Sequence, residues 1–159
     1  MKYIIRPITS GDEYFLSEML YQAIHIPKGK SPLPREIVYC AELAGYVQSW
    51  GSGGDCSFFA INANANQSIG AIWLRLLVGE NKGYGYVDDN TPEMSIAILP
   101  EYRGQGIGTQ LLTHLFTLDC GKSSVSLSVS ANNLAIRLYE RFGFKVVSRS
   151  DDSLTMKRY

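Results

Sequence analysis

A short run in the second half of the chain constrains the fold more than any other feature. Residues 96–109 read IAILPEYRGQGIGT, so an apolar, strand-like segment leads into three alternating glycines and then into an amphipathic helix pattern. The glycines, Gly104, Gly106 and Gly108, can take backbone angles closed to other residues and let a ligand lie against the main chain. Unpaired N–H groups of a first helical turn would point at its anionic oxygens. The run therefore predicts a loop that binds the diphosphate of a nucleotide-type cofactor.

Two common glycine-loop motifs do not fit this run. A Walker A loop ends in Gly-Lys-Ser/Thr, whereas Gly108 is followed by Thr109 and Gln110, which disfavours ATP or GTP. A dinucleotide fingerprint is G-x-G-x-x-G near the start of a βαβ unit, but here the third glycine comes one residue too early and late in the chain, which disfavours NAD. What remains is Arg-x-x-Gly-x-Gly, formed by Arg103, Gly106 and Gly108.

A second block about thirty residues further on supports one family. Residues 132–144 read NNLAIRLYERFGF and match N-x-x-A-x-x-L-Y-E-x-x-G-F at every fixed position. The two blocks resemble the acetyl-CoA loop and the second signature of the GNAT superfamily of N-acetyltransferases. With their flanking strands they cover residues 92–147, about a third of the chain. The resemblance implies a layered α/β (α+β) fold, with a central mixed, mostly antiparallel sheet of about seven strands, splayed at the acetyl-CoA site and flanked by about four helices.

Composition limits the other function classes. A length of 159 residues with 45% hydrophobic content predicts a single domain over residues 1–159. Fifteen basic and fifteen acidic residues give no electrostatic footprint for nucleic acid or an anionic membrane. No apolar run is long enough for a signal peptide or a membrane span, which predicts a cytoplasmic protein. Three cysteines without a CxxC pair predict plain thiols and no metal site.

Apolar periodicity predicts the order of helices and strands. The predicted elements are a strand over 3–8, a helix after residues 9–12, a second helix from Pro34 through Val47, hairpin strands 57–64 and 68–77, a strand over 94–99, a helix with its apolar stripe from Ile107, a strand over 125–130 and closing strands 144–148 and 153–157.

The resemblance also implies where acetyl-CoA binds. The backbone N–H groups of the loop would bind the pyrophosphate, and Thr109 would add its hydroxyl. The residues implied are Arg103, Gly104, Gln105, Gly106, Ile107, Gly108 and Thr109. Arg103 either pairs with phosphate or orders the loop. The pantetheine arm is an extended amide chain that can add to an open strand edge, here formed by Ile96, Ala97 and Ile98. Strand 125–130 should splay away to admit it, and a backbone N–H near Ile98 or Leu99 could stabilise the oxyanion.

Direct transfer to an amine calls for a general acid and a general base. Tyr139 is the general acid that the resemblance implies. Asn132 lies seven residues earlier, which would place both on one side of a helix, and it would contact the cofactor or cap that helix. The family has no fixed base and often uses a water. Glu93, at the start of the strand that leads to the loop, is the first candidate for the base, with Asp88 and Asp89 as runners-up.

The acceptor pocket is predicted from segments that the motifs leave free. Tyr86, Trp73, Asp88 and Asp89 would suit an amine with an apolar body. The two aspartates would bind a cationic acceptor or merely shape a turn.

The sequence as a whole predicts an acetyl-CoA-dependent N-acetyltransferase acting on a primary amine of a small molecule by direct attack. The alternatives are a protein N-terminal or lysine acetyltransferase and a non-catalytic acyl-CoA-binding sensor. Dimers are common on this fold, and a homodimer is compatible with the sequence.

Overall fold

The described residues form seven strands and four α-helices, and these follow one another in the order that the sequence predicts. The structure is a computed structural model that describes residues 3–8, 12–24, 31, 33–47, 56–79, 82–117 and 124–159. The strands are β1 (Tyr3–Pro7), β2 (Cys56–Asn62), β3 (Gln67–Arg75), β4 (Glu93–Ile98), β5 (Val125–Ser130), β6 (Lys145–Ser150) and β7 (Ser153–Arg158). The α-helices are α1 (Glu13–Ala23), α2 (Ala41–Ala44), α3 (Ile107–Thr117) and α4 (Ile136–Arg141), and the 3₁₀ helices are η2 (Arg35–Tyr39) and η4 (Pro100–Tyr102).

The strands form one mixed sheet in the order β1-β2-β3-β4-β5-β7-β6. Each pair of neighbours is antiparallel except β4 and β5, which run parallel. The predicted mixed, mostly antiparallel α/β sheet is therefore confirmed.

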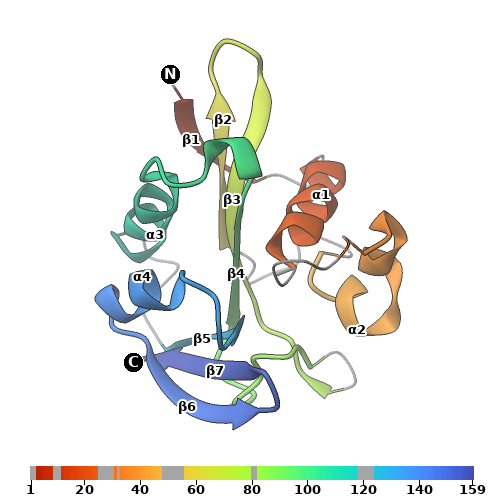
Figure 1. Ribbon diagram of the computed structural model, residues 1–159, viewed down its shortest axis with the longest axis vertical. Coiled ribbons are helices and arrows are strands. Elements are labelled where there is room, and N and C mark those ends of the chain that lie inside the picture. The colour runs from red at the N-terminus through yellow and green to blue at the C-terminus, as the bar shows by residue number, and fades with distance from the viewer. Residues whose placement is uncertain are drawn as a thin grey trace.

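The parallel pair in the middle of the sheet is almost unpaired. β4 pairs with β3 along its whole length, from Glu93 opposite Arg75 to Ile98 opposite Gly70. With β5 it shares a single register pair, Glu93 opposite Ser126. The two strands thus meet only where both begin and separate toward their carboxyl ends, as the predicted splay requires. Figure 1 shows β5, β7 and β6 turned away from the direction of β4.

Helices cover both faces of the sheet (Figure 1). On one side α1 buries Leu16, Met19 and Leu20, whose spacing of three and four residues places them on one helical face. On the other side α3 buries its stripe of Ile107, Leu111, Leu112 and Leu115, and α4 lies beside it. Each such side chain contributes roughly 1.5–3 kcal/mol by its removal from water. The two layers enclose β3 and β4 between them.

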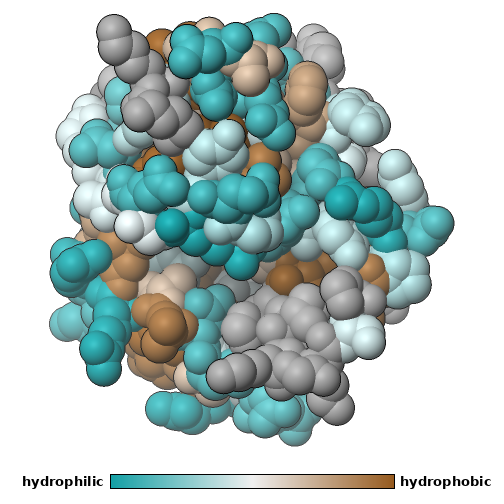
Figure 2. Space-filling view, turned by 45° about the horizontal axis from the view of Figure 1, so that its top comes forward, coloured by the Kyte–Doolittle hydropathy of each residue, from teal (hydrophilic) through white to brown (hydrophobic). Residues whose placement is uncertain are grey.

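The outer surface is mixed in character. On the face drawn in Figure 2, hydrophilic residues dominate and hydrophobic ones form separate patches among them. Within the described ranges, no helix is long and apolar enough to cross a bilayer.

The helix predicted from Pro34 through Val47 is wrong as a continuous element. The chain forms η2, turns at Cys40, whose φ of −68° and ψ of 157° are extended, and then forms the short α2. The run Ile37-Val38-Tyr39 contains two β-branched residues and an aromatic one, all of which lose side-chain freedom in a helix. This break brings the end of α2 back over the sheet.

Two local predictions also need correction. Asn132 lies in a turn before α4 rather than on it, so it cannot share a helical face with Tyr139. The side chain that hydrogen-bonds a backbone N–H just before α4 is that of Asn133, whose Oδ1 accepts from the Ala135 N–H at 2.9 Å. Cys40 is a free thiol, but Cys56 is disulfide-bonded, so the prediction of plain thiols is wrong for Cys56.

Candidate active site

The glycine loop takes the unusual backbone angles that its sequence predicts at two of its three glycines, while Gly108 lies within α3. After η4, Gly104 and Gly106 take φ values of 74° and 84°, a left-handed region that strongly favours glycine. The first helical bond of α3 runs from Gln110 N–H to the Gly106 carbonyl at 3.1 Å. The N–H groups of Ile107, Gly108 and Thr109 therefore have no partner within the helix and face the space beyond its start.

Arg103 orders this loop, which was one of its two predicted roles. Its Nε donates to the Ile98 carbonyl at 3.0 Å, and its Nη2 donates to the Gln22 carbonyl at the end of α1 at 3.4 Å. Gln105 adds a further contact, from Nε2 to the Glu101 carbonyl at 3.2 Å. The loop is thus tied to the carboxyl end of β4.

The alternation of β4 assigns its side chains to two different faces. Ile98 lies beside Gly70, where an added Cβ would also meet Ile107 of α3. This face, shared by Ile96 and Ile98, is therefore the one that α3 covers. Glu93 and Ala97 belong to the opposite face, toward α1 and α2.

Tyr139 reaches the core from α4. Its ring is buried and packs edge-to-face on Phe144, with 6.0 Å between ring centroids. Burial raises the pKa of its phenol to about 12. Among the described residues no group hydrogen-bonds its hydroxyl, so a neutral, unengaged proton donor stands on the α3 and α4 side of the sheet.

Glu93 stands on the other side, in an enclosed polar cluster. Its carboxylate is 5% exposed and accepts hydrogen bonds from the Tyr46 hydroxyl and from the Gly85 N–H, the latter at 3.1 Å. Burial raises its pKa to about 7, against the opposing effect of the two hydrogen bonds. Ser126, its register partner on β5, carries a buried hydroxyl without a partner in the described parts of the chain. The space between β4 and β5, which widens from Glu93 and Ser126 toward the carboxyl ends of the two strands, is called the wedge below. A carboxyl group that can lose its proton near neutral pH thus lies at the closed end of the wedge.

Tyr46 is the functional neighbour that sequence reasoning missed. It follows α2 and is 47 positions from Glu93 in the chain, and no local pattern distinguishes it from other tyrosines. Only the return of the chain after Cys40 places it over β4.

The predicted acceptor residues separate into two groups. Asp88 shapes a turn, since one carboxylate oxygen accepts from Asn90 N–H and the Thr91 hydroxyl, both at 2.8 Å, and the other lies 3.6 Å from Lys157 Nζ. These contacts, led by the Thr91 bond, lower its pKa. Asp89 accepts a hydrogen bond from the Tyr86 hydroxyl at 2.5 Å, which raises the pKa of that phenol. The three residues lie on one partly exposed loop, 86–89.

Trp73 is not a pocket residue, which corrects its predicted role. It has no exposed surface, and its indole Nε1 donates to the Tyr46 carbonyl at 3.1 Å. β3 is buried from Ser68 to Arg75, as expected for a strand covered on both faces. An aromatic ring at this position packs in the core.

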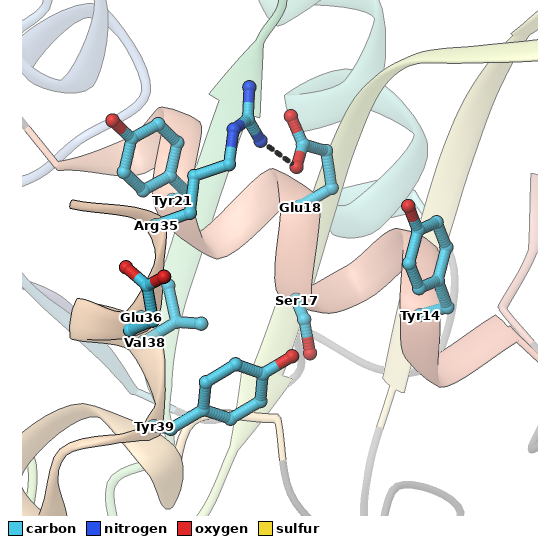
Figure 3. Close-up of a pocket in the computed structure, with 8 residues that line it drawn as sticks. All are labelled: Tyr14, Ser17, Glu18, Tyr21, Arg35, Glu36, Val38 and Tyr39. Atoms are coloured by element: carbon cyan, nitrogen blue, oxygen red, sulfur yellow. Dashed lines mark hydrogen bonds and ion pairs between the residues drawn. The ribbon is translucent and has the colours of Figure 1, made fainter.

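A separate groove of about 510 Å³ lies between α1 and η2 (Figure 3). Four of its residues, Tyr14, Ser17, Glu18 and Tyr21, follow helical spacing on α1, on the side opposite to Leu16 and Met19. Arg35 crosses it, bonds Glu18 and lies over the Tyr21 ring, 4.8 Å from the centroid. The groove therefore faces away from β4, and no residue of the wedge lines it.

Comparisons with known proteins agree with this geometry. The family model described as an acetyltransferase (GNAT) domain matches residues 34–146, more than half of the chain. The protein therefore belongs to the GNAT acetyltransferase family, as the two sequence signatures predict.

Individual relatives are more distant. The chain is 35% identical over 77 residues to the peptidyl-lysine N-acetyltransferase YjaB of Salmonella typhimurium, a match that covers 48% of this chain and 43% of that protein. It is 50% identical over 46 residues to human cysteine-rich protein 2-binding protein, covering 29% of this chain and 6% of that protein. The matches thus span less than half of either relative.

Solved structures resemble the whole chain. The PaiA N-acetyltransferase of Thermoplasma acidophilum, in complex with coenzyme A, superposes with a TM-score of 0.68 at 21% identity and 99% coverage of both chains. A GNAT superfamily phosphinothricin acetyltransferase of Sinorhizobium meliloti, in complex with AcCoA, gives 0.68 at 19% identity, covering 99% of this chain and 88% of that one. At these identities the likeness establishes the fold.

Proposed function

We propose that this protein is an N-acetyltransferase that moves the acetyl group of acetyl-CoA to a primary amine by direct attack in a ternary complex. One observation carries the proposal. The sheet opens between β4 and β5, with an ionisable carboxyl group, Glu93, on one face of the sheet where the two strands still pair, and a buried, unengaged phenol, Tyr139, on the other face.

Acetyl-CoA is the donor, and its pyrophosphate, pantetheine arm and thioester each match a different group of backbone N–H and C=O groups at α3 and β4. The pyrophosphate lies on the N–H groups that start α3, between Gly106 and Thr109. The pantetheine amides add to the open edge of β4 at residues 96–98, because that edge has no strand opposite it beyond Glu93. A backbone N–H at Ile98 or Leu99 donates to the thioester carbonyl; since Leu99 N–H already bonds the Ile69 carbonyl at 2.9 Å, Ile98 is the better donor.

The two ionisable groups have complementary roles. The amine nitrogen attacks the thioester carbon while Glu93 accepts the proton that it loses, directly or through one water. The carbon–sulfur bond then breaks, and Tyr139 donates its proton to the departing thiolate. A base with a pKa of about 7 and an acid that stays protonated suit this transfer near neutral pH.

The acceptor is a small molecule in this proposal. The 86–89 loop offers an aromatic ring and two carboxylates at the surface near the Glu93 cluster, a combination that suits a cationic amine. Peptidyl-lysine is the second candidate, because the match to YjaB covers nearly half of this chain.

The test is acetyl transfer to a panel of acceptors. The full chain is mixed with acetyl-CoA and either small amines, such as polyamines, amino acids and aminoglycosides, or lysine-containing and free-N-terminal peptides, and release of the CoA thiol is followed. Turnover with a small amine that Tyr139→Phe reduces supports the proposal, whereas turnover with peptides alone favours the second candidate. Acetyl-CoA binding without transfer to any member would overturn it in favour of an acyl-CoA sensor.

A further inference from the structure

The Tyr46 hydroxyl occupies a central position in the Glu93 cluster. It donates to Oε2 of Glu93 and accepts the Tyr84 N–H at 2.8 Å. The side chain is 6% exposed, so water competes little for these bonds. Both hydrogen-bonding capacities of the phenol are therefore engaged, and its donor direction is fixed toward the carboxylate.

The main chain around Tyr46 is fixed independently by the sheet. Trp73 Nε1 donates to the Tyr46 carbonyl, and Arg75 Nη1 donates to the preceding carbonyl, that of Gly45, at 3.1 Å. Both donors are side chains of β3, the strand that pairs with β4. The same part of the sheet thus positions both the Tyr46 phenol, through these bonds from β3, and the Glu93 carboxylate, which β4 carries.

Two glycines close the cluster from the 82–91 segment. A Cβ added at Gly83 would lie 2.2 Å from Oε1 of Glu93 and 2.6 Å from the Tyr46 hydroxyl oxygen. A Cβ added at Gly85 would lie 2.7 Å from the Leu127 carbonyl carbon on β5. No side chain fits between this backbone and the pair, which explains why a glycine-rich segment is found here.

The charged groups around Glu93 lie on one row across the sheet. Arg75, Glu93, Ser126 and Lys157 occupy successive register positions on β3, β4, β5 and β7. The Arg75 guanidinium donates to the Gly45 carbonyl, and Lys157 pairs with Asp88 on the 82–91 segment. Ser126 is uncharged, and Tyr46 comes from the turn that follows α2. Among the described residues, Tyr46 is the side chain that hydrogen-bonds the carboxylate and lowers its pKa against the effect of burial.

We propose that Tyr46 is a positioning residue of the transfer reaction, holding the Glu93 carboxylate in place and stabilising its charged form so that Glu93 can accept the proton of the amine. This inference rests on the proposed role of Glu93 as the base. Removing the hydroxyl withdraws a hydrogen bond that favours the charged form, so the pKa of Glu93 should rise and Glu93 should become a proton acceptor at a higher pH.

The test measures the ionisation of Glu93 with and without the Tyr46 hydroxyl. In ¹³C-labelled protein, the Glu93 carboxyl resonance is identified by its loss in Glu93→Gln and is titrated by NMR. Tyr46→Phe is expected to raise its midpoint by about one to two pH units, the size expected for one hydrogen bond to a charged group. The matched control is Tyr21→Phe, which removes a phenol that bonds the Leu33 carbonyl on the outer side of α1 and should leave the midpoint unchanged. An unchanged midpoint in folded Tyr46→Phe would overturn the proposal.

Kinetics separate this inference from the proposed function. Activity is measured with acetyl-CoA and the amine of fastest turnover. In the pH profile of kcat/KM, Tyr46→Phe should shift the acidic limb to higher pH by the same number of pH units as the NMR midpoint. The variant should keep most of its rate at high pH. If Glu93→Gln retains the acidic limb, Glu93 is not the base and the positioning role is also overturned, while the NMR titration still reports whether the pair is coupled. If Tyr46→Phe does not fold, the intact chain labelled with 3-fluorotyrosine should show one ¹⁹F signal that follows the Glu93 midpoint and stops doing so in Glu93→Gln; its absence would contradict the proposal.

Discussion

Burial of Glu93 should make the folded protein less stable as pH rises, and Glu93→Gln should remove this effect. The pKa of the carboxyl is raised from 4.5 to about 7, chiefly by burial. The folded state therefore binds the proton more tightly than the unfolded chain does. The stability that this preference contributes is fully present below pH 4.5 and is lost as the pH rises through 7. The whole change is worth about 3 kcal/mol, of which about 2–3 kcal/mol falls between pH 5 and pH 8.

The assay is urea unfolding of both proteins at pH 5 and pH 8, followed by far-UV circular dichroism. All other titrating groups are shared, so the difference in free energy of unfolding between the two proteins isolates Glu93. From pH 5 to pH 8, the free energy of unfolding of Glu93→Gln should rise by about 2–3 kcal/mol relative to that of the wild type. Glu101→Gln, which alters an exposed carboxylate on η4, is the control and should show no such change. A Glu93→Gln difference that is equal at pH 5 and pH 8 would show that the carboxylate is not desolvated in the fold.

The other predictions concern the acid and the glycines. Tyr139→Phe should lower kcat by about 10²-fold with little change in the KM for acetyl-CoA, because only proton donation is lost; an unaltered kcat would rule out this acid. Gly106→Ala places a side chain at a φ of 84° and should weaken acetyl-CoA binding about tenfold in a direct titration, whereas Gly108→Ala, whose Cβ would lie 3.4 Å from the nearest side chain, should bind normally. Gly85→Ala should cost about 1–3 kcal/mol in the free energy of unfolding, because its Cβ would meet the Leu127 main chain; a wild-type value would show that the 82–91 segment can move aside.

Structural features that depend on one continuous stretch of the chain were predictable from the sequence. The glycine loop combines a strand, residues with positive φ and a helix start within fourteen positions, and its backbone follows the prediction. The strand expected over residues 125–130 matches β5 at both ends, because its alternating apolar positions face a core.

Features that depend on long-range packing were not predictable. Tyr46 and Glu93 are 47 positions apart, and their contact requires the break at Cys40 that periodicity alone does not reveal. Aromatic composition predicts a pocket position for Trp73, but a single sequence does not say whether a ring faces a ligand or the interior. Asn132 matches the family signature, yet the helix begins four residues later, so its spacing from Tyr139 carried no geometric meaning.

The gap between β4 and β5 gives the protein two strand edges that face each other inside one sheet. Unpaired edges on a protein surface invite pairing with other chains and aggregation, and proteins usually protect them with charges, bulges or covering segments. Here they face each other inside the sheet and meet at one register pair. In the proposed reaction the pantetheine arm of acetyl-CoA pairs with the β4 edge, so the same unpaired backbone that would be a hazard at the outer edge serves to bind the donor.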